Sequence, residues 1–464
     1  MSIAMDAACL QCSLLRNIET EQPKNTLSAT VRRRETAACL LLLLAGTILK
    51  LIYALRVPYD ISPHDLGYVS DWRVYGTGHL SYIQYLFHQH TLVPSISGQF
   101  YHPPLFHIVG AMVFQLYYVE GSTADAAFEL IQILNTLFAC GISLVGYRIL
   151  VRLGITGKKL VLLTGFLSFC PTLYWLGVTL NNDCLMALLQ AMAIEQTIAW
   201  IHRPRTKEIV KIALFLALAM LTKTSAVLLA PAIGCVFLYE LIRRIRQKNG
   251  VPALIGQFVI FALISIPLGI SYVLRNWLCF ATPPNYVVDI GGARNPQYVG
   301  NCTLLQRLGL PTLIQLFSVR IHWDSPADYC NLWGQTFLTM ALDEGILRLS
   351  NVFTKCLGGL LVWSGCIVVF LLLSGFIRTL LSRTVDVPIR LVLGVGATVF
   401  FFSYCLFAFQ YPYICTMNFR YIVNVPVLLA AGYGISSREM SAGAQAILWG
   451  YNLLTAALYL FCAV

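Results

Sequence analysis

The chain has 464 residues, of which 58% are hydrophobic and 11% are charged, and its formal net charge is +11. Its mean hydropathy is +0.71. Ordinary soluble domains carry about 25% charged residues, so this composition excludes a soluble multidomain enzyme, a disordered chain and a disulfide-stabilised secreted module. Repeated apolar stretches of about 20 residues are long enough to cross a bilayer as helices. The composition therefore predicts an all-α polytopic membrane protein.

The positive charge is distributed as membrane topology requires, not as a nucleic-acid-binding surface would. Most lysines and arginines lie before the first apolar stretch or in short loops at 148–159, 203–211, 243–248 and 378–390. Such residues collect in cytoplasmic loops, where they face an anionic leaflet. We therefore predict that these loops are cytoplasmic and that membrane lipid, with no nucleic acid, is the partner of the basic surface.

The N-terminal region predicts a signal-anchor helix. Residues 1–35 form a polar, cytoplasmic tail that ends in Arg32-Arg33-Arg34, and an apolar stretch follows at 36–55 without a small-residue cleavage site. We expect the remainder, 36–464, to form a single transmembrane domain with two large outer loops, at 56–128 and 274–352.

The loops then divide the chain into about eleven spans. We expect them at 36–55, 129–151, 160–179, 184–201, 208–221, 225–242, 253–273, 353–377, 390–409, 421–436 and 443–463. The stretch 104–118 is apolar too, but a crossing there would move the basic loops outside. It reaches only about 22 Å as a helix, against a hydrocarbon core of about 30 Å. We expect a half-embedded outer helix, with the N-terminus cytoplasmic and the membrane that of a bacterial cell.

Most cysteines lie in apolar stretches, where cysteine acts as a small hydrophobe. Cys279, Cys302, Cys330 and Cys415 fall in segments that we place outside. Four cysteines allow three pairings, and the sequence leaves all three open.

Acidic residues in the first outer loop are candidates for a general base. Asp65 follows the first span by about ten residues and is flanked by His64 and Tyr68. A carboxylate at the mouth of a helix bundle can take a proton from an incoming hydroxyl, which accelerates a reaction by about 10²–10⁴-fold. The alternative is an ordinary solvated loop acid.

A second acid and a lysine lie at the ends of later spans. Asp183 follows Asn181-Asn182 and either caps a helix or belongs to a site. Lys223 lies between two short apolar stretches. A lysine in lipid is costly and usually faces a partner or a wet cavity; the alternative is snorkelling to the interface.

Two arginines lie at the same predicted outer level as Lys223. They are Arg275 and Arg420, the latter followed by Tyr421. Three cations on one face suit an anion such as a phosphate, which guanidinium binds in a bidentate manner. Singly, each arginine is also a common interfacial anchor. Trp323, in the second outer loop, either stacks on a sugar or packs within the loop. No histidine pair has the spacing of metal ligands. A divalent metal bound through Asp65 stays possible, but the sequence does not require one.

The ordered motifs resemble the GT-C glycosyltransferases, in the branch that holds protein O-mannosyltransferases and lipid A aminoarabinose transferases. The matching residues are Asp65, His102-Pro103-Pro104-Leu105, Asn182-Asp183, Leu221-Thr222-Lys223, Arg275-Asn276-Trp277, Phe419-Arg420-Tyr421 and Pro426. The resemblance covers about 55–430. It implies a GT-C-like helix bundle, a polyprenyl- or dolichyl-phosphate sugar donor, an outer-face site and an inverting transfer. The family's paired carboxylates in the first loop read His64-Asp65 here, so a second adjacent acid is missing.

Together these patterns predict an inverting membrane glycosyltransferase, with a protein, lipid or glycan as acceptor. The catalytic candidates are Asp65 as base and Asp183, which positions the acceptor or Lys223. The donor phosphate is assigned to Lys223, Arg275 and Arg420. The substrate-binding candidates are His64, Tyr68, Tyr101, His102, Asn182, Trp323 and Tyr421. The loop 274–352 is expected to close over the acceptor.

Two other classes of protein remain. A transporter or flippase of a lipid-linked or anionic solute also needs buried charges, although the matched half-repeats common in transporters are not found. A membrane scaffold would not need acids and cations on one face.

Overall fold

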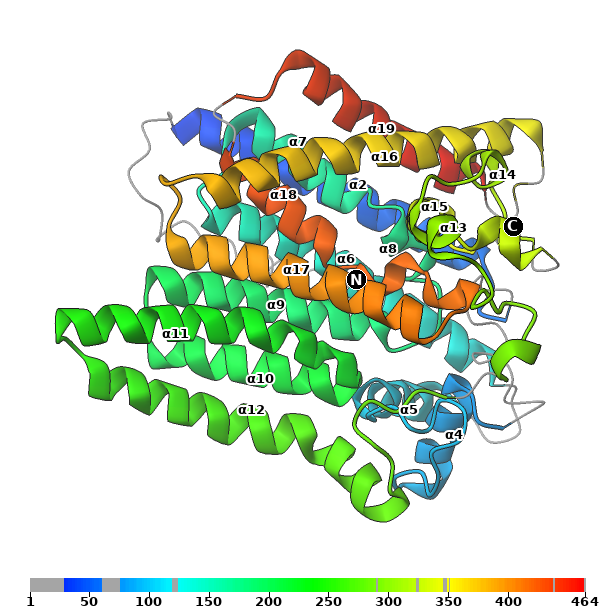
Figure 1. Ribbon diagram of the computed structural model, residues 1–464, viewed down its shortest axis with the longest axis horizontal. Coiled ribbons are helices and arrows are strands. Elements are labelled where there is room, and N and C mark those ends of the chain that lie inside the picture. Colours follow the sequence, from blue (N-terminus) through cyan, green and yellow to red (C-terminus); the bar gives the residue numbers. More distant parts are fainter. Residues whose placement is uncertain are drawn as a thin grey trace.

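The computed structural model describes residues 29–60, 76–118, 124–288, 291–322, 325–344, 349, 351–436 and 439–462. Within these ranges the chain is helical, and its only β-type pairing is an isolated bridge between Tyr298 and Tyr413. The helices of the bundle are α2 (Ala29–Arg56), α6 (Asp125–Arg152), α7 (Gly157–Ser168), α9 (Asp183–His202), α10 (Thr206–Thr222), α11 (Ala230–Gln247), α12 (Val251–Phe280), α16 (Val352–Leu381), α17 (Val387–Gln410), α18 (Val425–Ser436) and α19 (Ala442–Phe461). The prediction of an all-α fold is confirmed (Figure 1).

Eight helical stretches in the described part of the chain are long and apolar enough to cross a membrane, or nine if one bent pair counts as a span. They comprise α2, α6, α9, the stretch Thr224–Gln247, α12, α16, α17 and α19. The protein is therefore an integral membrane protein. The figure of eleven crossings stays a prediction, because α7, α10 and α18 are each shorter than a full span.

The predicted span 160–179 is wrong as a continuous helix. Helix α7 ends at Ser168, and only a single turn, α8 (Thr172–Trp175), precedes α9. Pro171 lies at this break, where it can donate no helical hydrogen bond. The irregular backbone that follows is buried, and such backbone is tolerated at membrane depth only where protein groups satisfy it.

Side chains of α6 satisfy that backbone. Asn135 donates to the carbonyl oxygens of Leu176, Gly177 and Thr179, at 3.1, 3.1 and 2.6 Å. Gln132 donates to the carbonyl of Val178 at 2.9 Å. These bonds hold the irregular connection that leads directly into the start of α9.

The predicted span 421–436 is also interrupted. A 3₁₀ turn, η6 (Phe419–Ile422), precedes α18, and the two halves are bent by 46°. Pro426 has no N–H to donate to the carbonyl of Ile422, which weakens a continuous helix at this point. The bend places the residues of η6 in the interior of the molecule.

The apolar stretch 104–118 forms helix α5 (Leu105–Tyr117), which is too short to be a candidate span; its half-embedded position stays a prediction. It pairs with α4 (His79–Gln89). Both lie at the same end of the bundle as α13 (Leu304–Leu308), α14 (Leu313–Phe317) and α15 (Leu332–Leu342), to the right in Figure 1. The residues of the predicted site come from this end.

The second large loop does more than cover the bundle from outside. Its helix α15 packs between α16 and α17: Trp333 stacks on Phe401 of α17 with ring centroids 6.0 Å apart. The Thr336 hydroxyl lies 2.8 Å from that of Tyr404, also on α17. The Met340 side chain reaches Gly365 of α16. Much of 325–344 is therefore part of the buried core.

Candidate functional site

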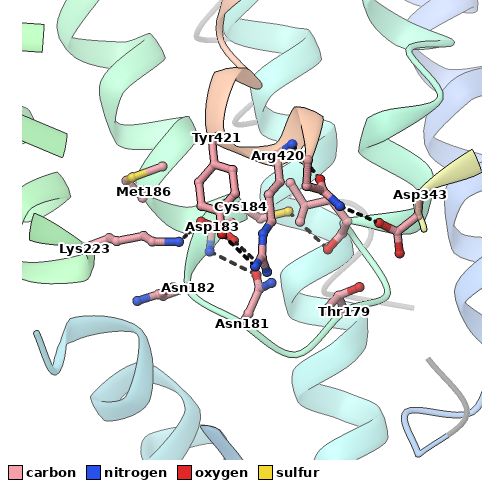
Figure 2. Close-up of polar contacts among 12 residues, drawn as sticks. Thr179, Asn181, Asn182, Asp183, Cys184, Met186, Lys223, Asp343, Arg420 and Tyr421 are labelled. Carbon is pink, nitrogen blue, oxygen red and sulfur yellow. Dashed lines mark hydrogen bonds and ion pairs between the residues drawn. The ribbon is translucent and has the colours of Figure 1, made fainter. Parts of the chain in front are cut away.

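Asp183 and Lys223 form a buried ion pair. The Lys223 ammonium lies 2.5 Å from Oδ1 of Asp183, and the two side chains are 14% and 2% exposed. Asp183 is the first residue of α9, and Lys223 follows the last residue of α10. The Asn182 amide donates to the Thr222 carbonyl at 2.9 Å and thereby holds the two helix ends together. Figure 2 shows the ammonium directed at the carboxylate.

The Asp183 carboxylate is directed at cations and does not cap its own helix. The N-cap residue of α9 is Asn182, which makes no side-chain capping bond. The Asp183 N–H instead donates to Oδ1 of Asn181 at 3.0 Å. An acid in the first turn still interacts favourably with the helix dipole, but its oxygens are available to the neighbouring positive side chains.

Arg420 supplies the second cation. Its Nη1 lies 3.9 Å from Oδ2 of Asp183, and its Nη2 donates to the Tyr421 hydroxyl at 3.0 Å. The Tyr421 ring lies 4.9 Å from the guanidinium carbon and 5.6 Å from the Lys223 nitrogen. One aromatic ring therefore accompanies both cations, a favourable cation–π arrangement.

A pair of acids that the sequence analysis missed supports Arg420 from the other side. The Asn418 amide donates to Oδ1 of Asp343 at 3.0 Å and to Oε1 of Glu344 at 3.4 Å. Its Oδ1 accepts from the Arg420 N–H at 2.9 Å. Asp343 has φ 56°, a strained backbone for a residue with a side chain. The signal in the sequence was the adjacent Asp-Glu after an apolar stretch.

The two groups of acids lie on opposite sides of Arg420. In Figure 2, Lys223 and Asp183 are on one side and Asp343 on the other. On the side of Arg420 that faces Asp183, two cations meet one carboxylate, so that side has a net positive charge, whereas Asp343 adds negative charge on the other side. An anion with several oxygens, such as a phosphate, suits that charge.

His102 lies next to the cations, within a group of buried imidazoles. Its ring is parallel to that of His79, 5.8 Å away, and His79 is in turn parallel to His107, 5.3 Å away. Nδ1 of His79 lies 2.9 Å from Nε2 of His107. Burial lowers the pKa of His102 well below its usual 6.5, and Lys223 and Arg420 lower it further. His102 is therefore neutral at neutral pH.

Tyr101 lies beside His102, with ring centroids 4.1 Å apart. Its carbonyl accepts a hydrogen bond from Asn276 of α12 at 3.1 Å. The motif around His102 is thus anchored to α12, and it brings an imidazole within electrostatic range of Lys223.

Arg275 is not brought to the other two cations by the contacts that the structure gives it. Its Nη2 donates to the Val93 carbonyl at 2.5 Å, and its Nη1 donates to Oδ1 of Asn276 at 3.0 Å. Its guanidinium carbon lies 5.1 Å from the rings of Tyr272 and Phe280. These contacts fix the segment after α4 to α12.

Four predicted site residues lie outside the described residues. They are Asp65, His64, Tyr68 and Trp323. Their roles stay predictions. Within the described ranges no group of three His, Cys, Asp or Glu side chains is arranged to hold a metal ion.

Comparison with known proteins addresses the resemblance that the motifs indicated. The family model described as dolichyl-phosphate-mannose-protein mannosyltransferase matches residues 101–269. No curated protein matches the chain. The matched segment contains Tyr101, His102, Asp183 and Lys223.

Two solved structures match the chain at low identity. The apo oligosaccharyltransferase of Archaeoglobus fulgidus is 13% identical with a TM-score of 0.47, and the alignment covers 91% of this chain and 56% of that one. The chain therefore spans little more than half the length of that enzyme. ArnT from Cupriavidus metallidurans, solved with undecaprenyl phosphate, is 11% identical with a TM-score of 0.37, covering 86% of this chain and 77% of that one. The family match covers little more than a third of the chain, and it agrees with the resemblance to the protein mannosyltransferases that the ordered motifs indicated.

Proposed function

We propose that the chain is a membrane glycosyltransferase that moves a sugar from a polyprenyl-phosphate-linked donor to an acceptor hydroxyl or amine on the outer face, with inversion. The observation that carries the proposal is the buried set of Asp183, Lys223 and Arg420, which retains positive charge beside a tyrosine ring. Two of these three residues lie in the segment that matches the mannosyltransferase family.

The chemistry of the transfer explains why the cations lie where they do. The bond between the anomeric carbon and the lipid phosphate breaks, and negative charge grows on the departing phosphate. Positive groups fixed in advance stabilise charge that develops in the transition state. Lys223 and Arg420 would perform this role, and Asp183 would hold the ammonium in place when no donor is bound.

The acceptor must lose a proton as it attacks. Asp65 stays our candidate for the base, because an aspartate in the first outer loop is the carboxylate that the resemblance assigns there. Inversion follows from a single in-line displacement, in which the acceptor oxygen or nitrogen attacks the face opposite the phosphate. Water must be excluded because it would hydrolyse the donor.

For Arg275 we propose a different role from the one the sequence suggested. Its hydrogen bond to the Val93 carbonyl holds the segment between α4 and α5 against α12. We propose that it positions the loop carrying His102, while the phosphate interacts with Lys223 and Arg420.

The test is sugar transfer by the purified protein in proteoliposomes, with synthetic polyprenyl-phosphate sugars as donors. The wild type is compared with the site variants Asp65→Asn and Lys223→Met. Lys211→Met is the matched control, because Lys211 is an exposed lysine of α10, the helix that Lys223 directly follows. We expect transfer by the wild type and the control, and a loss of at least 100-fold in both site variants. Mass spectrometry of the lipid that co-purifies identifies the donor.

The same proteoliposomes distinguish a glycosyltransferase from the alternative function, a flippase. Movement of a labelled polyprenyl-phosphate lipid between leaflets, with no transfer from any donor, would favour a flippase, which also requires buried charge. Full transfer activity in Asp65→Asn would remove the assignment of the base without removing the enzyme.

A further inference from the structure

Two of the four cysteines that the sequence places outside lie in neighbouring segments. Both are free thiols here, and the side chains of Cys302 and Cys330 are close enough to interact with each other and with Arg307. Cys302 packs against the same buried core that contains Cys330. Cys279, by contrast, is exposed at the end of α12. The structure thus singles out one of the pairings that the sequence leaves open.

The backbone on both sides of this pair is held by hydrogen bonds. Thr303, directly after Cys302, forms a capping box with Gln306 at the start of α13. Asn331, directly after Cys330, donates to the carbonyls of Gln306 and Gly309 at 3.1 and 2.8 Å. The two cysteines therefore belong to one locally ordered unit, in which the thiols are kept close.

We propose that Cys302 and Cys330 form a disulfide bond in the mature protein, made on the non-cytoplasmic side, where disulfides persist. The oxidant is a disulfide-carrying thiol oxidoreductase of that compartment. One cysteine thiolate attacks the oxidoreductase's disulfide and releases one of its thiols. The second cysteine thiolate attacks the mixed disulfide, so the chain loses two protons and two electrons and the oxidoreductase gains them.

Burial sets the order of these steps. Cys302 is partly exposed, whereas Cys330 is buried. The pKa of the Cys330 thiol is raised to about 12, mainly by burial and in part by the contact with Cys302. Because the thiolate is the nucleophile, the accessible Cys302 attacks the oxidoreductase first and Cys330 resolves the mixed disulfide.

The test is peptide mapping by mass spectrometry of the full-length protein, alkylated in membranes before purification and digested without reductant. We expect a peptide pair joined through Cys302 and Cys330, two hydrogens lighter than the sum of its parts, with Cys279 alkylated. In Cys302→Ser the thiol of Cys330 becomes free, and in Cys330→Ser that of Cys302 does. Alkylation of both thiols in the wild type, or a link from either to Cys279 or Cys415, would overturn the proposal. The readout needs no sugar transfer, so it is independent of the proposed activity.

A different observation concerns the apolar face of α13 and α14. Leu305, Leu310 and Phe317 are 79%, 94% and 72% exposed. Leu304, Leu313 and Ile314 are exposed as well, and of these six residues only Leu310 lies in the link between the two helices. Two polar side chains of the same segment point the other way: Arg307 and Gln315 are buried and donate to carbonyls of Ala408 and Asn331. A loop that lies in water would be expected to expose these two side chains and to bury its leucines.

The neighbours of this face fix its depth. The Phe317 ring lies 6.0 Å from that of Trp363. Trp363 is eleven residues beyond Val352, the first residue of α16, which at 1.5 Å per residue is roughly 16 Å along the helix. Trp363 and Phe370 are themselves exposed on α16, so the apolar face continues the lipid-facing surface of a membrane-spanning helix.

We infer that α13 and α14 are inserted into the bilayer and that lipid acyl chains cover their apolar face. The segment 304–317 would anchor the second large loop beside α16, in place of lying over the acceptor. Interfacial helices bind membranes in this way, through apolar side chains buried in the acyl region.

The inference is tested by two footprinting reactions on the full-length protein in proteoliposomes. A membrane-soluble photoactivated carbene should label Leu310, Leu313 and Phe317 about as strongly as Phe370, and hydroxyl radicals generated in water should leave them unmodified. In Leu313→Asp, carbene labelling of Ile314 and Phe317 should fall several-fold. Strong labelling by water-borne radicals would overturn the inference. Protection from both reagents, with chemical crosslinks from 304–317 to a second copy, would overturn it in favour of a dimer interface.

Discussion

The ammonium of Lys223 and the carboxylate of Asp183 meet at 2.5 Å, although the two residues are separated by 40 positions and lie at the ends of different helices. This contact requires the N-terminal end of α9 to lie beside the C-terminal end of α10 in space. The Asn182 amide, hydrogen-bonded to the Thr222 carbonyl, ensures that register. The pair is thus a consequence of how two helix ends are joined, and its disruption should be measurable separately from catalysis.

Breaking this pair from one side should destabilise the protein. Asp183→Asn leaves Lys223 and Arg420 with less compensation, and loss of a hydrogen bond to a charged group costs about 1.5–3 kcal/mol. Lys223→Met removes the charge itself. We expect the double variant to be less destabilised than the sum of the two single variants, by about 0.5–3 kcal/mol, in unfolding measured in detergent.

Activity should behave differently from stability in that cycle. If Lys223 stabilises the departing phosphate, the double variant stays inactive even where its stability is regained. Additive stability effects would mean that the two side chains do not interact, and recovered transfer would show that the pair serves only folding.

Arg420→Lys should reduce transfer about 10–100-fold while the protein stays folded. Lysine keeps the charge but loses the planar fork that binds two phosphate oxygens, and it loses the hydrogen bond from Nη2 to the Tyr421 hydroxyl. Arg378→Lys is the control, because Arg378 is exposed and donates to Ser374 on its own helix. Initial rates at saturating donor measure the effect. Equal rates in the two variants would contradict a role of the guanidinium in binding phosphate.

Asn135→Leu should be among the most destabilising single substitutions. It removes the donor to three carbonyls of the irregular segment before α9, and an unsatisfied buried polar group costs about 1–3 kcal/mol. We expect a loss of at least 3 kcal/mol, measured by denaturant or thermal unfolding in detergent. Ser271→Ala serves as control, since that exposed hydroxyl bonds only within its own helix. A loss below 1 kcal/mol would show that water replaces the amide.

Stability should fall as the pH falls below about 6.5. Burial, Lys223 and Arg420 all lower the pKa of His102 in the folded state, whereas the unfolded chain titrates near 6.5. Below that pH the unfolded state binds a proton that the folded state does not, so linkage favours unfolding. The melting temperature between pH 7.5 and 5 measures this effect. His102→Gln should flatten the profile, and an unchanged slope in that variant would assign it to other groups.

Hydropathy and charge were sufficient for the all-helical class and for the membrane location. Both depend on properties that are local in the sequence: a stretch of apolar residues is long enough to cross, or, like α5, it is not. The break at Lys223, between α10 and the following 3₁₀ turn, could also be predicted, because a polar residue between two apolar stretches is a local feature of the sequence.

The interruption after Ser168 was not readable with equal ease. The apolar composition of the stretch predicts one helix, and only Pro171 signals a break. A buried, irregular backbone survives there because Gln132 and Asn135, on a helix about 40 residues earlier, satisfy its carbonyls. No pattern within the stretch itself records those donors.

By itself the sequence determined which residue types occur at the ends of the spans, and so nominated Asp183, Lys223, Arg275 and Arg420 together. Only the tertiary structure decided that Asp183, Lys223 and Arg420 converge, that Arg275 bonds to the segment after α4, and that Cys302 lies against Cys330. The physical reason is that hydropathy acts on each stretch separately, whereas the partner of a buried charge or thiol is chosen by packing between elements far apart in the chain.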